Sequence, residues 1–175
     1  MKTLLKLITA FFTAGALLVT TNANAQTTPS GALRFNLGFD TGLPTGNLSI
    51  GSEFVIGGTA RLQYGLSNDF AITLTSGADH FISKINPATG KKFDSFGVIP
   101  IKAGIKYFFV PHIYFGEEPG IAIEETDSGT GHKKFLLSTA AGWGSSKWDV
   151  GIRYDNYAGQ NDPYGVVALR IAYGF

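Results

Sequence analysis

The sequence contains no cysteine. This absence excludes a disulfide scaffold, a thiolate metal site, a cysteine nucleophile and a lipid-bearing cysteine. An excess of charge of one sign is missing too, because 14 basic residues stand against 13 acidic ones. The composition therefore gives no reason to expect nucleic acid or another highly charged partner. No metal and no cofactor is expected.

Long apolar runs are missing beyond the first 25 residues. At the start of the chain, two lysines precede an apolar run from about Leu7 to Val19, and the small-residue motif Ala23-Asn24-Ala25 follows. This order is typical of a cleavable secretory signal. The alternative is a membrane anchor, but the run is shorter than the roughly 20 residues that a spanning helix needs. We expect residues 1–25 to be a signal peptide cleaved near Ala25, and residues 26–175 to form one exported domain.

Glycine and aromatic residues are abundant instead, with 23 Gly, 14 Phe, 7 Tyr and 2 Trp. This composition favours strands and turns. Apolar and polar residues also alternate with period two, as they do in strands that have one apolar face. The alternation predicts eight strands, at about residues 32–40, 53–64, 70–79, 96–108, 113–123, 134–144, 148–155 and 167–175.

The connections between these strands alternate in length. Short connections are expected at about 65–69, 109–112 and 145–147, and long ones at about 41–52, 80–95 and 124–133. Bacterial transmembrane barrels have tight periplasmic turns on one rim and longer extracellular loops on the other. We therefore predict an all-β fold, an eight-stranded antiparallel transmembrane β-barrel with up-and-down meander topology. A soluble ligand-binding barrel, with the apolar face inside, is the alternative.

Aromatic residues of the apolar face gather beside the short connections. A membrane interface selects amphipathic rings at one level. We expect these rings at the periplasmic rim, and we expect the terminal stretch VALRIAYGF to close the barrel there. The expected interface residues are Tyr64, Phe70, Tyr107, Trp143, Trp148, Tyr173 and Phe175.

Five stretches resemble the small outer-membrane β-barrel family, in the size class of OmpX and the OmpA transmembrane domain and most similar to its Bacteroidetes-type members. They are GLPTGN, RLQYGLSNDFAITLTSG, FGVIPIKAGIKYFF, WDVGIRYDNY and LRIAYGF. The resemblance implies insertion into the bacterial outer membrane and recognition of the terminal aromatic strand by the barrel-assembly machinery. It implies no particular activity, because one scaffold hosts several functions.

The polar side of the strands carries charges of both signs in equal number. In a barrel of eight strands the interior is just wide enough for side chains to fill. We expect these charges to form ion pairs in the lumen; a ligand or proton pathway is the alternative. The expected lumen residues are Arg34, Asp40, Glu53, Arg61, Asp79, Lys102, Lys106, Glu118, Asp149, Arg153, Asp155 and Arg170.

Catalytic patterns are weak in this sequence. His80, His112 and His132 are expected in or next to connections, on different rims, so they are not expected to share a metal. A barrel hydrolase acting on lipid would need a serine beside a histidine, and Ser83 near His80 is the loose candidate. No catalytic activity is expected.

The strand predicted at 113–123 contains an anomaly, because its alternation points Glu117 and Pro119 toward lipid. A charge is costly there, and a proline removes a ladder hydrogen bond. We expect a β-bulge near Glu117 to Pro119. The alternatives are that Glu117 stays wet near a rim or that the site touches a partner.

The expected function is therefore a structural or surface-interaction role in the outer membrane. The chain is expected to be monomeric, in contact with outer-membrane lipid, with an unidentified extracellular ligand. The alternatives are a small barrel enzyme acting on membrane lipid and a narrow pore for small solutes.

Overall fold

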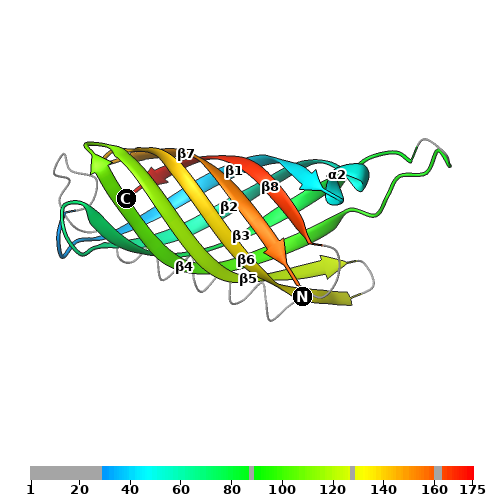
Figure 1. Cartoon of the computed structure of the whole chain (residues 1–175), viewed down its shortest axis with the longest axis horizontal. Coiled ribbons are helices and arrows are strands. Elements are labelled where there is room, and N and C mark those ends of the chain that lie inside the picture. The colour runs from blue at the N-terminus through cyan, green and yellow to red at the C-terminus, as the bar shows by residue number, and fades with distance from the viewer. Residues whose placement is uncertain (1–28, 87–88, 127–128, 160–162) are drawn as a thin grey trace.

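A computed structural model describes residues 29–86, 89–126, 129–159 and 163–175. The predicted signal peptide lies outside these residues. The strands form one closed barrel in which each is hydrogen-bonded to its neighbours in sequence, and β1 also pairs with β8 (Figure 1). The predicted fold class is confirmed. The strands are β1 (Leu33–Gly46), β2 (Ser52–Gly65), β3 (Phe70–Ser83), β4 (Phe96–Val110), β5 (Ile113–Thr126), β6 (Gly129–Gly144), β7 (Trp148–Ala158) and β8 (Tyr164–Gly174), with a short helix α2 (Leu48–Gly51).

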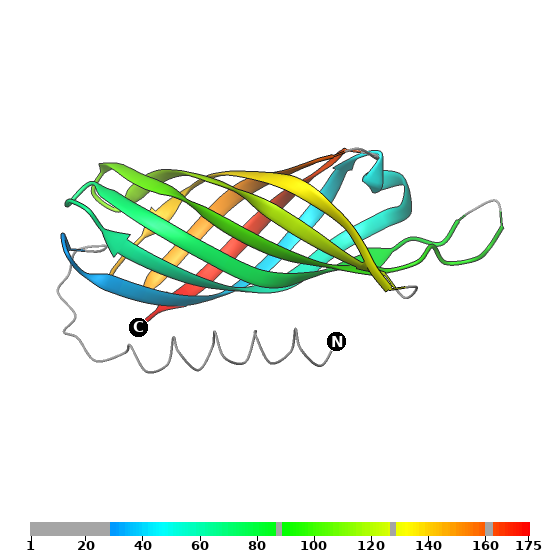
Figure 2. The same ribbon diagram turned by 90° about the horizontal axis from the view of Figure 1, so that it is seen from below.

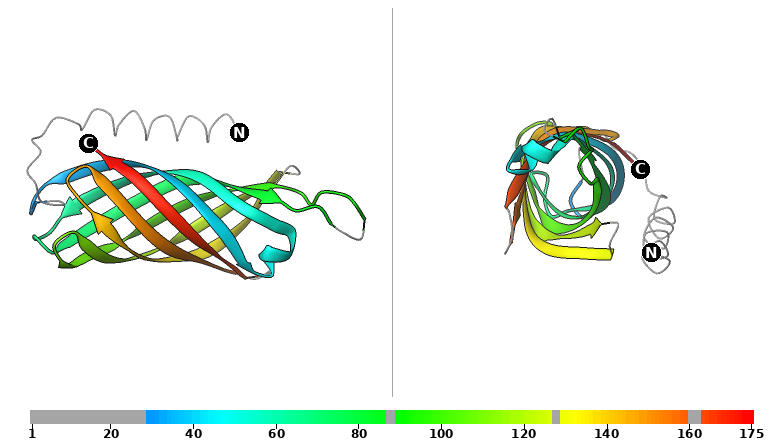
Figure 3. Two further views of the ribbon diagram at one scale, coloured as in Figure 1. Left: turned by 90° about the horizontal axis from the view of Figure 1, so that it is seen from above. Right: turned by 90° about the vertical axis from the view of Figure 1, so that its right-hand side faces the viewer.

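The two rims of the barrel differ. The tight-turn rim carries the connections at residues 66–69, 111–112 and 145–147, and the C-terminus lies there (Figure 2). The opposite rim carries α2 and the two arms of a hairpin, residues 84–86 and 89–95, which project beyond the barrel wall (Figure 1). The view along the axis shows the strands as a closed ring (Figure 3, right).

Several strands reach further toward the opposite rim than the alternation predicts. β3 continues to Ser83 rather than ending near residue 79, and β1 continues to Gly46. Most of the connection expected at 124–133 is strand, because β5 ends at Thr126 and β6 begins at Gly129. Cross-strand pairing therefore extends beyond the segments in which apolar residues alternate.

The bulge expected near Glu117 to Pro119 is absent, and that prediction is wrong. The register of β5 with β6 shifts further along the strand, between Ile123 and Glu125. The pairing of β5 with β6 keeps one register from Ile113 to Ile123. Glu117 faces the exterior opposite Thr139, whose hydroxyl donates a hydrogen bond to the Glu117 carboxylate at 2.8 Å. The carboxylate thus has a cross-strand partner without any change of register.

Another register shift lies at the start of β2, where the pairing with β3 shifts between Ser52 and Phe54. This shift turns Ser52 into the lumen and leaves Glu53 exposed. The prediction that Glu53 faces the lumen is therefore wrong, because an extra residue in one strand reverses the side on which its neighbours point.

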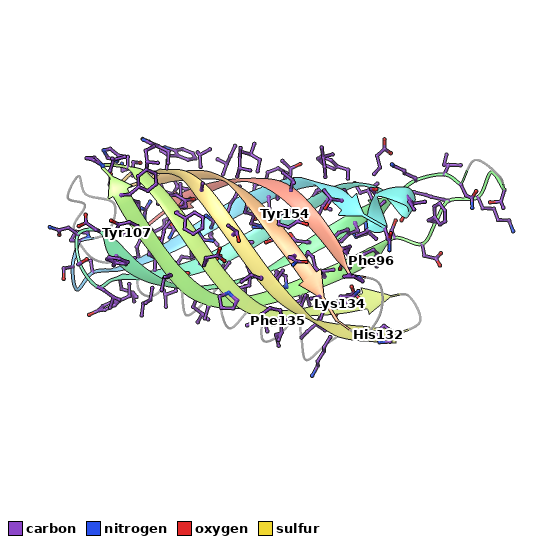
Figure 4. All side chains as sticks on the ribbon, in the orientation of Figure 1. Phe96, Tyr107, His132, Lys134, Phe135 and Tyr154 are labelled. Carbon is purple, nitrogen blue, oxygen red and sulfur yellow. The ribbon has the colours of Figure 1, made fainter. Side chains whose placement is uncertain are left out.

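The exterior of the barrel is apolar between the rims, and its large side chains project outward from every strand (Figure 4). Exposed examples are Phe39, Ile72, Ile105, Ile152 and Leu169. A continuous exposed apolar surface of this kind marks an interaction with membrane or protein. Within the described ranges, no helix is long and apolar enough to cross a membrane.

Candidate functional site

The lumen contains the predicted charges, with the exception of Glu53. Side chains of alternate residues point to opposite faces of a strand, so each strand directs one set inward. The buried lumen charges are Arg34, Asp40, Arg61, Asp79, Lys102, Lys106, Glu118, Asp149, Arg153, Asp155 and Arg170.

Arg153 on β7 is the centre of the middle layer of the lumen. Its Nη1 donates to Asp40 at 2.5 Å and its Nε donates to Asp155 at 2.6 Å. Its Nη2 lies 3.8 Å from a carboxylate oxygen of Asp79. The Thr59 hydroxyl also donates to Asp40, at 2.7 Å. One guanidinium therefore joins carboxylates from β1, β3 and β7.

A second group in the middle of the lumen centres on Glu118 of β5. Arg61 donates to one of its oxygens at 2.8 Å, and the hydroxyls of Thr73 and Thr75 donate to the other at 2.7 Å each. The ammonium of Lys102 lies 3.9 Å from Glu118 and 3.7 Å from the Asp155 carboxylate. Lys102 therefore connects the two groups across the lumen.

A third group closes the tight-turn end of the lumen. Lys106 forms an ion pair with Asp149, and its ammonium lies 3.6 Å from the centre of the Tyr114 ring. The Tyr114 hydroxyl donates to Asp149 at 2.8 Å, and the Phe108 ring packs against Tyr114. A cation above an aromatic face is stabilised by the ring quadrupole. Charges and rings together fill this end.

The lumen is not polar throughout, contrary to the prediction. Toward the opposite rim it is filled by a cluster of aromatic and aliphatic side chains. Phe81 stacks on Phe96 with ring centres 4.5 Å apart, and Tyr157 stacks on Tyr164 at 4.6 Å. The ring of Phe81 meets both tyrosine rings edge-on. These four residues, which we call the aromatic plug, close the lumen above the ion pairs.

Two charged lumen residues were not among the predicted ones. Lys134 on β6 is buried, and its ammonium lies 3.7 Å from Glu124 on β5 and 4.7 Å above the Tyr164 ring. The Tyr164 hydroxyl donates to Glu124 at 2.7 Å. Both share the inward phase of Ser138 and Glu118, so the alternation contained the signal.

The structure does not support a histidine–serine pair. His80 lies within β3 and is exposed, whereas Ser83 is buried and donates a hydrogen bond to the carbonyl of Asp94. Residues three apart on a strand face opposite sides. His112 lies in the turn between β4 and β5, and His132 is exposed near the opposite rim (Figure 4). In the part of the chain with described coordinates, no group of His, Asp and Glu could hold a metal ion.

The predicted interface aromatics lie on the exterior near the tight-turn rim, where Figure 4 labels Tyr107. The rings of Phe70 and Tyr107 stack 4.6 Å apart across β3 and β4. Trp148 meets Tyr173 edge-on at 5.2 Å. The remaining residues of this set are Tyr64, Trp143 and Phe175, which are all exposed.

The opposite rim carries a joined surface formed by α2 and residues 84–86 and 89–95, which we call the α2–hairpin platform. The backbone N–H of Lys84 donates to Gly51, and its ammonium donates to the Ser49 carbonyl, both at 2.8 Å. The platform exposes Ile50 by 72% and Ile85 by 66%. Two large apolar side chains are thus held in water at the end of the barrel.

No protein-family model and no curated protein matches this chain. Solved structures do match it. Ail, the attachment invasion locus protein of Yersinia pestis, gives a TM-score of 0.53 at 13% identity. The match covers 83% of this chain and 99% of the Ail chain. The chain has the fold of the small outer-membrane β-barrels. The N-terminal β-barrel domain of Pseudomonas aeruginosa OprF gives a TM-score of 0.53 at 12% identity, covering 87% of this chain and all of that domain. Neisserial surface protein A gives a TM-score of 0.52 at 14% identity. The match covers 87% of this chain and 100% of that protein's chain.

Proposed function

We propose that this protein is a sealed outer-membrane barrel that presents the α2–hairpin platform at the cell surface, where it contacts an extracellular partner. The filled lumen is the observation that carries the proposal. Three successive layers of side chains occupy it: the Asp149 group, the ion pairs of Arg153 and Glu118, and the aromatic plug. A lumen filled in this way leaves no continuous channel, so the barrel serves as an anchor.

The platform supports a role in surface contact. Backbone and side-chain hydrogen bonds hold the hairpin against α2, and Ile85 pairs with Lys92 across the hairpin. A rigid surface loses little conformational entropy when it binds. Exposed Ile50 and Ile85 supply apolar area, and exposed Lys91 and Lys92 border it. This combination favours a protein or glycoconjugate partner over a small solute.

The tight-turn rim is proposed to face the periplasm. The interface aromatics would then lie at the inner headgroup level, and lipid would cover the apolar wall. We propose that the barrel-assembly machinery recognises the terminal strand β8, that the protein is monomeric, and that residues 1–25 are removed near Ala25. On the five quoted stretches, we also propose membership of the Bacteroidetes-type barrels. We propose that the protein has no catalytic activity, because its histidines and serines form no catalytic pattern.

Labelling of single cysteines tests the orientation and the contact together. Ile85→Cys should react with a membrane-impermeant maleimide on intact cells, whereas Ser146→Cys on the tight-turn rim should react only after lysis. With a photoactivatable maleimide, Ile85→Cys should give a discrete cross-linked product that Ile50→Asp weakens. Labelling of Ser146→Cys alone would invert the orientation, and unchanged cross-linking in Ile50→Asp would remove the platform from the contact.

Planar lipid bilayers test the sealed lumen. The purified protein should give no steady conductance, because the aromatic plug and the ion pairs leave no continuous water path. An open porin measured in the same bilayers provides the positive control. Stable channels whose ion selectivity changes in Arg61→Ala or Arg153→Ala would establish the pore instead.

A further inference from the structure

Two buried polar side chains, on β1 and β8, point into the lumen. Asn36 is fully buried and Arg170 is 3% exposed. Among the described residues, no group hydrogen-bonds to the Asn36 amide or to the two terminal nitrogens of Arg170. The Nε of Arg170 donates to the Thr59 hydroxyl at 3.0 Å. Buried donors left unsatisfied are costly, so such groups normally bind water or an ion.

The backbone brings these groups toward each other. Arg170 pairs with Asp40 across the β1–β8 seam, but its guanidinium lies over Gly38, where a Cβ would be 3.0 Å from Nη2. Gly38 is the next inward position after Asn36 along β1. A side chain at residue 38 would crowd the guanidinium. The guanidinium thus lies beside Gly38, one inward position from Asn36, with its Nη1 3.6 Å from Asp149.

Positive charge accumulates at this end of the lumen. Lys106, Arg170 and Arg34 all interact with the charge of Asp149. One Asp149 oxygen pairs with Lys106, and the other accepts the hydroxyl of Tyr114. The Arg170 Nη1 lies 3.6 Å from Asp149, which is longer than an ordinary hydrogen bond.

In the middle layer of the lumen, negative charges outnumber positive ones. There, three carboxylates (Asp40, Asp79 and Asp155) surround Arg153, and Lys102 lies beside Asp155. Cations thus predominate near the tight-turn rim and carboxylates predominate in the middle. A negative group beside Arg170 would lower the electrostatic energy of the lumen.

We propose that a small inorganic anion of the chloride class binds between the terminal nitrogens of Arg170 and the amide nitrogen of Asn36. A halide accepts several N–H donors at once and supplies the missing negative charge. A water molecule satisfies a donor but leaves the charge uncompensated. This site is independent of the surface contact proposed above, because it lies inside the barrel at the other end.

Bromide is the probe for this site, because its anomalous X-ray scattering identifies it in crystals. Wild-type crystals grown in bromide should show an anomalous peak between Arg170 and Asn36. The urea-unfolding midpoint in detergent should rise with bromide concentration when gluconate keeps the ionic strength constant. Asn36→Leu should lose this rise. Asn156→Leu, which changes an exposed asparagine on the exterior of β7, should keep it.

A second variant keeps the proposal testable where Asn36→Leu does not fold. Asn36→Asp places a carboxylate beside Arg170, so it should fold without halide and show no bromide dependence. The proposal is overturned by the absence of a peak at the site, by a peak without any rise in the midpoint (an adventitious ion only), or by equal bromide dependence in wild type and Asn36→Asp.

Discussion

Replacing Arg153 by alanine should lower the free energy of unfolding by about 3 to 5 kcal/mol, the cost of removing one partner from a buried ion pair. The guanidinium donates to Asp40 and Asp155 and lies 3.8 Å from Asp79. Without it, three buried carboxylates remain close together, with Thr59 still donating to Asp40 and Lys102 3.7 Å from Asp155. Urea titration of the folded barrel in detergent measures the loss.

Two comparisons make this result specific to the ion pairs. Arg61→Ala should cost less than Arg153→Ala, because Glu118 keeps the hydroxyl donors of Thr73 and Thr75 and lies 3.9 Å from Lys102. Lys91→Ala on the exposed hairpin should change stability by less than about 0.5 kcal/mol, as surface substitutions usually do. Equal midpoints for Arg153→Ala and Lys91→Ala would show that the buried charges do not stabilise the barrel.

The side of the wall on which a charge lies could be predicted from the sequence, but its partner could not. Alternation assigns Arg153 and Asp40 to the polar face because side chains on a strand repeat every two residues. Their contact joins residues 113 positions apart. That contact depends on the stagger between strands in the closed barrel. The alternation of residues along one strand does not specify this stagger.

The aromatic plug shows a different limit. Phe81 and Tyr157 follow Asp79 and Asp155 by two residues, so both continue the inward phase. The alternation predicts strands that end at residues 79 and 155, so it assigns neither ring to the lumen. The inward face instead changes from charged to aromatic toward the opposite rim. Alternation predicts the face of the strand on which a side chain lies. It does not predict whether that face is charged or aromatic at a given depth in the barrel.

Glu53 and Glu117 show why the predicted position of the β-bulge is wrong. The predicted bulge was assigned to Glu117 because a charge on the lipid side breaks the pattern, but Thr139 stabilises that carboxylate within a regular register. The register shifts lie near strand ends instead, beside Ser52 in β2, between Phe108 and Val110 in β4 and between Ile123 and Glu125 in β5. Bulges depend on the local geometry of the strand end, which alternation does not report.

Deleting Phe175 should greatly reduce the yield of folded barrel, because this residue ends the seam that closes it. β1 and β8 pair from Asn36 opposite Gly174 onward, and the N–H of Phe175 donates to the carbonyl of Phe35 at 2.8 Å. The exposed Phe175 ring also packs near Tyr173 and Phe35.

Trp148→Ala is the matched control for this deletion, since it removes a similarly exposed interface ring from β7. That ring meets Tyr173 edge-on, but its loss leaves the backbone hydrogen bonds between β1 and β8 in place. Heat-modifiable migration of membrane extracts on a gel measures the folded fraction. We expect deletion of Phe175, or Phe175→Asp, to reduce that fraction several-fold more than Trp148→Ala does. An equal loss in both variants would mean that Phe175 acts only as one more interface aromatic. Closure of β1 on β8 would then depend on the ladder from Asn36 to Gly46 alone.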